Sequence, residues 1–152
     1  MTNQQTIELI GICAVVLSLV FVGFELRQNS SIARTEVQQS FTASLSELSA
    51  SISHDSELAV ALQKVLNPGE ATETITEIEH IKLQTFIVAD LYVLYGLFLS
   101  VEEGVLPEEY LSMVNVSGLL NNDYFRNFWP SQTNQFSPEF VAFFETLPWN
   151  NK

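Results

Sequence analysis

Residues 9–24 read LIGICAVVLSLVFVGF, a run of sixteen residues in which only Ser18 carries a polar side chain. A helix over residues 7–24 would span ~27 Å at a rise of ~1.5 Å per residue. A bilayer's hydrocarbon core is ~30 Å thick, so this helix is just long enough to cross it if it stands nearly upright. The length and composition of the run therefore favour a lipid bilayer as its surroundings.

Charged side chains at both ends of the run support a transmembrane anchor. Glu8 lies at one end, and Glu25 with Arg27 at the other, where long side chains can reach the headgroups. We therefore predict a single-pass anchor that contacts the lipid bilayer through residues 7–24. Its boundary residues are Ile7, Phe24 and Arg27.

Three other structures compete with the anchor. A cleaved signal peptide has basic residues before its apolar run and a small-x-small site after it, but residues 1–6 carry no basic side chain and FELR at 24–27 is no such site. The start TIELI at 6–10 is similar to that of a type IV pilin, without the glycine and basic leader that a prepilin peptidase needs. The third alternative, a fully buried helix of a soluble bundle, is less favoured by the length rule.

Basic residues near the run set the expected orientation. None precedes it, whereas Arg27 and Arg34 follow it closely. The positive-inside rule then places the remainder of the chain on the cytoplasmic side. We accordingly divide the chain into an anchor, residues 1–27, and a helical bundle domain, residues 28–152.

Composition limits the partners of this domain. The chain has 152 residues, with 18 acidic against 6 basic side chains and a net charge of −12. About 125 residues remain without the anchor, which is enough for one hydrophobic core. The acidity disfavours nucleic acid and anionic headgroups, so we expect no nucleic-acid partner. The single cysteine, Cys13, lies in the apolar run, which excludes an intramolecular disulfide and a cysteine zinc site.

Helical periodicity continues after the anchor. Apolar residues spaced by three and four predict an amphipathic helix over about 30–53, which can continue directly from the anchor because no glycine or proline lies between Glu25 and Ser53. Asp55 supplies an N-cap for a second helix, which the sequence NPG at 67–69 ends.

A long helix is predicted from about Glu73 to Glu103. Its first half is amphipathic, and its charged residues Glu73, Glu77, Glu79 and Lys82 are expected outside. Its second half, residues 86–101, is apolar nearly all round, so it is either the core helix of a bundle or a second membrane span. Asp90 would be costly within hydrocarbon, and we therefore favour the core helix.

The C-terminal third contains further helix signals. Gly104 ends the long helix, and Pro107 begins the next one. A short aromatic helix over Tyr124–Trp129 stops at Pro130, and Ser137 starts a final helix. No strand-like alternation occurs. The predicted fold is all-α, with a single N-terminal transmembrane helix that continues into a four- to five-helix bundle.

One spacing suggests a metal site. Glu77 and His80 stand one helical turn apart, the Glu-x-x-His spacing of carboxylate-bridged di-iron bundles, and Glu73 would share their face. Such sites need the motif twice, and His54 has no acid at the matching offset. We therefore interpret these residues as a solvated face, and we predict no metal, no cofactor and no catalytic residues.

Two groups of residues are candidates for a ligand site. Asp90, if buried, must be paired or hydrogen-bonded, and the expected partner is a tyrosine hydroxyl, such as that of Tyr92, Tyr95 or Tyr124. This polar group is either a structural link or a ligand site. The aromatic residues of the C-terminal third have two interpretations. They form an exposed surface or a ligand pocket, or they form a lid that closes the bundle. The principal residues of this group are Trp129, Phe136, Phe140 and Phe144.

Four segments carry a family resemblance. FVGFELRQN at 21–29, GVLPEEY at 104–110, the F-x-x-F-W pattern ending at Trp129, and FSPEF at 136–140 resemble a group of small bacterial membrane-anchored proteins of unknown function. The resemblance covers nearly the whole chain and implies the bacterial inner membrane as its location. The chain departs from the group ahead of Gly104, where a glutamate is expected and Tyr95 or Gly96 stands instead. The group has no established activity to carry over.

The leading functional hypothesis is a membrane-anchored interaction or regulatory module without catalysis, with a protein partner or a second copy of the chain. The alternative is a small-molecule-binding or sensory bundle, with a pocket between residues 86–101 and the C-terminal aromatic residues. A weaker alternative is a carboxylate-metal enzyme that uses Glu73, Glu77 and His80.

Overall fold

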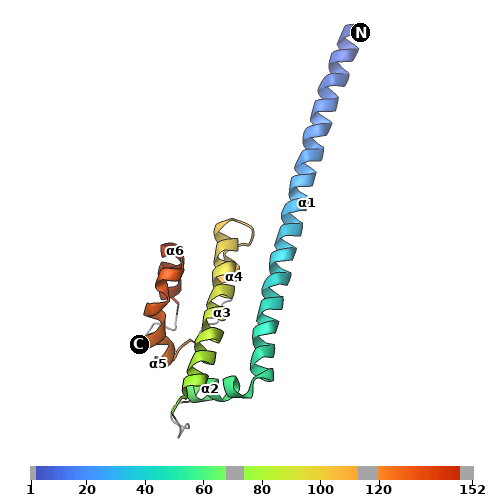
Figure 1. The fold of residues 1–152 in the computed structure, drawn as a ribbon. Helices are drawn as coiled ribbons and strands as arrows, with labels where there is room; N and C mark the ends of the chain where they lie inside the picture. Colours follow the sequence, from blue (N-terminus) through green and yellow to red (C-terminus); the bar gives the residue numbers. More distant parts are fainter. Residues whose placement is uncertain (1–2, 68–73, 113–119, 148–152) are drawn as a thin grey trace. The chain divides into compact units, whose positions relative to one another are not determined.

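The described chain is helical throughout its regular elements, as Figure 1 shows. The structure, a computed structural model, describes residues 3–67, 74–112 and 120–147, with the backbone alone for 3–10. These residues contain no strand, which confirms the all-α class. The elements are α1 (Asn3–His54), α2 (Ser56–Leu66), α3 (Glu77–Glu102), α4 (Glu109–Ser112), α5 (Asp123–Phe128), α6 (Pro138–Glu145) and the 3-10 turns η1 (Trp129–Ser131) and η2 (Thr133–Gln135).

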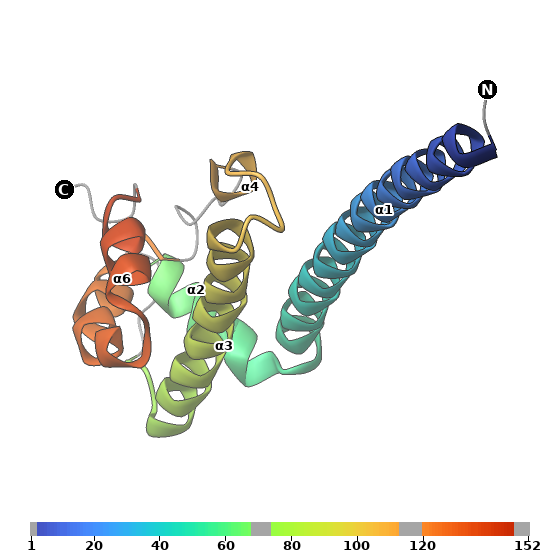
Figure 2. The ribbon, with the colours of Figure 1, turned by 90° about the horizontal axis from the view of Figure 1, so that it is seen from above.

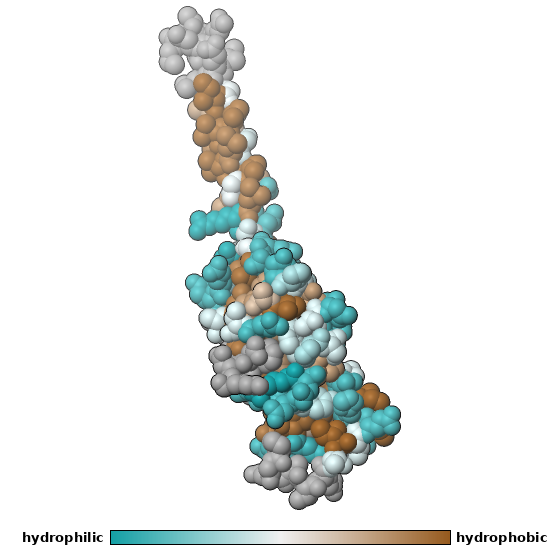
Figure 3. Space-filling view, turned by 90° about the vertical axis from the view of Figure 1, so that its left-hand side faces the viewer, coloured by the Kyte–Doolittle hydropathy of each residue, from teal (hydrophilic) through white to brown (hydrophobic). Residues whose placement is uncertain are grey.

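The chain divides into two compact units, residues 1–39 and 40–152. In the first unit, the large apolar side chains between Ile12 and Leu26 are exposed, each by about half to two thirds of its surface. Figure 3 shows this stretch of α1 in brown. The predicted absence of a helix break after Glu25 is confirmed, because α1 is helical as far as His54.

Asp55 separates α1 from α2. Its backbone is extended, and its Oδ1 accepts hydrogen bonds from the backbone N–H groups of Glu57 (3.0 Å) and Leu58 (3.1 Å). These are two of the donors that a helix leaves without partners in its first turn. The predicted N-cap is therefore confirmed.

Helix α3 begins at Glu77, later than the predicted start near Glu73, which itself lies outside the described residues. The reason is a capping box: Thr76 Oγ1 accepts from the Glu79 N–H (3.3 Å), and the Thr76 N–H donates to Glu79 Oε2 (2.7 Å). At the other end, Gly104 has a φ of +71°, a left-handed conformation that glycine adopts without strain. The predicted end of the helix is confirmed.

Two hydrophobic clusters lie against α3. The first, here called the α2–α3 cluster, comprises Leu58, Ala61, Leu62, Val65, Leu83 and Phe86, with Leu48 and Ile52 of α1 packed against it. The second, the aromatic cluster, joins α3 to the C-terminal elements, and Figure 2 shows α6 beside α3. Its buried members are Ile87, Leu91, Leu94, Phe98, Leu120, Phe125, Trp129, Phe136, Phe140 and Phe144.

Helix α3 is thus the element on which the second unit is assembled, but it is not buried on every side. Ile78, Ile81, Tyr92 and Leu99 are each exposed by more than a third. Both α1, from Gly11, and α3 are long and apolar enough to cross a membrane by length and composition. Core helices of soluble proteins and signal sequences meet the same criterion.

Candidate functional site

Asp90 lies half-buried in α3, and burial raises its pKa from 3.8 to about 6. It forms no hydrogen bond or ion pair with any residue that the structure describes. The expected link to a tyrosine is not formed: Tyr92 donates to Gln135 Oε1 (3.1 Å), and the Tyr124 hydroxyl lies 2.8 Å from His80 Nδ1. Residues two apart on a helix point about 200° from each other, so Tyr92 cannot face Asp90.

The third tyrosine candidate belongs to the aromatic cluster instead. The Tyr95 ring packs 5.4 Å from the Phe136 ring and 5.0 Å from the Phe140 ring, centroid to centroid. The structure therefore does not bring Asp90, Tyr92 and Tyr95 into one site.

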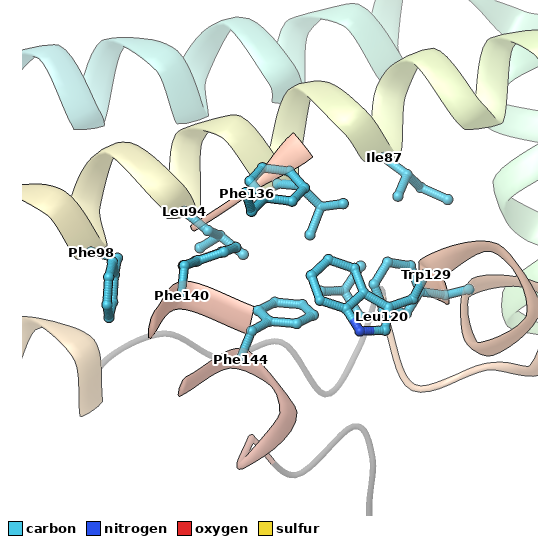
Figure 4. Packing of buried hydrophobic residues seen from close by; sticks show 10 residues of the cluster. Ile87, Leu94, Phe98, Leu120, Trp129, Phe136, Phe140 and Phe144 are labelled. Carbon is cyan, nitrogen blue, oxygen red and sulfur yellow. The ribbon is translucent and has the colours of Figure 1, made fainter. Parts of the chain in front are cut away.

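The C-terminal aromatic candidates are core residues. Phe140 and Phe144 are fully buried, and Trp129 and Phe136 are exposed by less than a tenth. Ring centroids lie 4.6 Å apart for Trp129 and Phe144 and 5.2 Å apart for Phe136 and Phe140. Figure 4 shows these side chains pointing toward one another and toward α3. Their burial favours the lid of the bundle over an exposed aromatic belt, which would need surface access.

The candidate metal ligands lie on the surface. Glu77 and His80 are exposed, and Glu73 lies outside the described residues. His80 contacts the Tyr124 hydroxyl through Nδ1 and packs edge-on against the ring of that tyrosine. Among the side chains that the structure describes, no three of His, Cys, Asp and Glu stand close enough together to hold a metal ion.

Glu79, predicted to lie outside with its neighbours, is in fact buried. Its two carboxylate oxygens accept hydrogen bonds from Lys64 Nζ at 2.8 and 3.0 Å, and both side chains are about 10% exposed. The Lys64 hydrogen bonds, followed by the one from the Thr76 N–H, hold the pKa of Glu79 below its ordinary value. The prediction was wrong because helical periodicity does not show that α2 covers this residue. The T-x-x-E spacing of a capping box was the signal available.

Lys82 connects α3 to the start of α2. Its Nζ lies 2.7 Å from Asp55 Oδ2 and 2.7 Å from Glu57 Oε2. Hydrogen bonds to Asp55 first and Glu57 second raise the pKa of Lys82, and the Lys82 hydrogen bond is the main cause that lowers the pKa of Asp55. Asp55 is therefore both the cap of α2 and an ion-pair partner of α3.

An open groove lies between α1 and α3, on the far side of α3 from the aromatic cluster, with a volume of about 470 Å³. From α1 and the α1–α2 junction it is lined by Ser44, Glu47, Leu48, Ser51, Asp55 and Leu58. From α3 it is lined by Ile81, Lys82, Thr85, Phe86, Ala89 and Val93. Figures 1 and 2 show the course of α1 and α3, the helices that carry most of these residues.

The sequence does not predict this groove. It predicts a pocket between residues 86–101 and the C-terminal aromatic residues, and the described rings there pack closely against one another. The signal in the sequence was weak: Ser44 and Ser51 stand seven apart, hence on one face of α1, beside the apolar Leu48. Small residues on one helix leave space beside it. Whether that space becomes a groove depends on which helix lies next to it, and the sequence pattern does not specify this.

No family model, no curated protein and no solved structure matches this chain. The resemblance to small bacterial membrane-anchored proteins thus stays a prediction. The groove and the exposed apolar stretch of α1 are the two features that bear on function.

Proposed function

We propose that this protein is a membrane-anchored, non-enzymatic interaction module that binds a protein partner in the groove between α1 and α3. The observation that carries the proposal is the groove itself: it is open, half of its twelve lining residues are apolar, and α1 and α3 form its two walls. Apolar surface that stays accessible on a folded unit is typical of an interaction site.

Residues 7–24 would hold the module in the bilayer. In support, the large side chains from Ile12 to Leu26 are exposed, and burial of such surface in hydrocarbon is strongly favourable. Arg27 and Arg34 form no ion pair with any described residue, which leaves both guanidinium groups for lipid phosphates. We place the chain in the bacterial inner membrane as a single-pass protein, with the bundle domain, residues 28–152, on the cytoplasmic side.

The ionisable groups of the groove support binding over catalysis. Asp55 and Lys82 pair with each other, and Asp55 also caps α2, so both serve the fold. Glu47 is the remaining titratable group of the lining. A lone surface carboxylate can steer a partner, whereas acid–base chemistry needs a positioned second group.

The anchor is tested by alkaline carbonate extraction of membranes. We expect the full chain in the pellet and a Leu17→Arg/Val20→Arg double variant in the supernatant, because two charges at the centre of the span oppose insertion. A Ser30→Arg variant, which adds charge outside the span, serves as the control. Release of the wild-type chain into the supernatant would refute the anchor. A reporter fused after Lys152 should be active in the cytoplasm only.

The partner is tested by site-specific photo-crosslinking in cells that produce the protein. A photo-reactive residue at Thr85, on the exposed rim of the groove, should give a discrete adduct with another protein. The same residue at Ala142, exposed on α6, should not. Absence of an adduct at Thr85, or equal adducts at both positions, would contradict a partner in the groove.

A small-molecule site is the second candidate function, and the groove volume favours it, because ligand pockets have volumes of about 300–1,000 Å³. The sequence predicts this ligand site between residues 86–101 and the C-terminal aromatic residues. We instead propose it in the groove between α1 and α3. Native mass spectrometry of the purified protein separates the two functions: a stoichiometric small molecule that an Ala89→Arg variant loses supports the ligand site.

A further inference from the structure

We infer that the partner of the groove is a basic amphipathic helix. This inference rests on the proposed function and specifies the chemistry of the occupant. Three properties of the groove lead to it: its length, its small residues and its charge.

The length and the openness of the groove suit a helix better than a small molecule, although its volume would admit either. On α3 its lining runs from Ile81 to Val93, which corresponds to ~18 Å at ~1.5 Å per residue. An occupant of that length is about three helical turns long. The groove is open along its side, whereas a small-molecule pocket buries most of its ligand. An amphipathic helix that lays its apolar face into such a groove is a recurring mode of recognition.

The lining lets a third helix approach closely. Ser44 and Ser51 on α1 and Ala89 on α3 are small, and they stand beside the apolar side chains of Leu48 and Phe86. Ridges of an incoming helix can enter between large side chains where small ones leave room, at interaxial distances of ~8–10 Å. The partner would therefore present leucine-sized side chains at positions three and four apart.

The charge of the groove selects a basic partner. Among the described residues that line it, Lys82 is the only cation, and its Nζ lies 2.7 Å from a carboxylate oxygen of Asp55 in the lining and 2.7 Å from one of Glu57 beside it. Glu47, on the opposite wall, forms no ion pair with any described residue. The groove thus carries excess negative charge within a chain of net charge −12. Repulsion disfavours a second copy of the chain and an anionic lipid surface as occupants, and lysine or arginine beside an apolar stripe fits best.

The experiment uses the full chain in nanodiscs of phosphatidylcholine, with empty nanodiscs as the reference. The probe is a fluorescent 14-residue peptide with leucine along one helical face and lysine elsewhere. The control peptide carries glutamate at every lysine position. We expect saturable binding of the lysine peptide to the protein and at least about tenfold weaker binding of the glutamate peptide.

Two variants locate the binding. Glu47→Lys should weaken binding of the lysine peptide by about tenfold, whereas Glu139→Lys, the same change at an exposed position on α6, should leave it unchanged. Ala89→Arg should block the floor of the groove, with Ala142→Arg as its matched control. Circular dichroism checks folding, and because Glu47 is exposed, its variant tests the inference even if Ala89→Arg misfolds.

Equal weakening by Glu47→Lys and Glu139→Lys would show diffuse attraction to an acidic chain and would overturn the inference. Equal binding of the two peptides would overturn it as well. If the lysine peptide fails to bind while Thr85 still gives a crosslinked adduct, the partner has another chemistry and the interaction function stands. If both fail, the proposed function fails with the inference.

Discussion

At the scale of single residues, two carboxylates of α3 respond to pH in opposite directions. Asp90 is half-buried, and its pKa is raised to about 6 by desolvation. Because the unfolded chain releases this proton near pH 3.8, ionisation of Asp90 in the folded protein costs stability as the pH rises through the interval from 3.8 to 6. That cost is complete above pH 6.

Asp90→Asn should therefore stabilise the protein at pH 8 and progressively less toward pH 4. A shift from 3.8 to about 6 corresponds to roughly 3 kcal/mol of unfolding free energy. Urea unfolding of the wild type and the variant at several pH values, followed by the signal of buried Trp129, measures this difference. A difference that is constant over pH would show that Asp90 ionises in the folded protein as it does in water.

Glu79 behaves in the reverse sense. Lys64 lowers its pKa, so the stability from this pair is present above the ordinary pKa of glutamate and is lost as the pH falls through the lower folded value. The two groups together favour a stability maximum in the weakly acidic range, between the titration of Glu79 and that of Asp90.

At the scale of elements, short helices depend on their caps. Helix α6 has eight residues, and Ser137 Oγ accepts from the Phe140 N–H (3.3 Å), followed by Pro138 in the first turn. This helix carries Phe140 and Phe144, so the aromatic cluster depends on a segment too short to be stable alone.

Ser137→Ala should lower the unfolding free energy by about 1 kcal/mol, because the Phe140 N–H loses its acceptor. Ser137→Asn should restore most of the loss, since asparagine is an equally good N-cap. Urea unfolding of the three proteins at one pH provides the comparison. If alanine and asparagine have the same effect, the side-chain acceptor does not stabilise α6.

Sequence patterns predicted the features that depend on neighbouring residues along the chain. Asp55 and Ser137 were identified as caps and Gly104 as a helix end, because each acts within one turn of its own position. Glu79 and the groove were missed for the opposite reason. Their environment depends on which helices lie side by side. The hydrophobic periodicity of one helix does not show which helix packs against it.

At the scale of the whole molecule, residues 40–152 depend on the aromatic cluster. Phe140 is fully buried, and its ring centroid lies 5.0 to 5.6 Å from those of four neighbours. These neighbours are Tyr95, Phe98, Phe136 and Phe144. Such contacts join α3 to the end of the chain, so one ring bridges elements that are distant in sequence.

Phe140→Ala should cost about 3–5 kcal/mol, a large part of the about 5–15 kcal/mol that stabilises a typical domain. Near-ultraviolet circular dichroism should show loss of the fixed aromatic environment, and the conservative Phe140→Leu should lose less. Carbonate extraction of the variant should still leave it in the pellet, because residues 7–24 belong to the other unit. A variant as stable as the wild type would contradict the role of the cluster.

The Lys64–Glu79 pair has a further consequence for the tolerance of the chain to insertion. The Glu79 carboxylate, in the first turn of α3, accepts hydrogen bonds from Lys64 Nζ in the last turn of α2 and from the Thr76 N–H. Lys64 Nζ also donates to the Thr74 carbonyl (3.3 Å). The two helix ends are thus held together independently of the length of chain that connects them. Doubling such a connection costs only about 0.6 kcal/mol in closure entropy. We therefore expect both helices to keep their positions when the segment between them is lengthened, and circular dichroism of such an insertion variant would measure this.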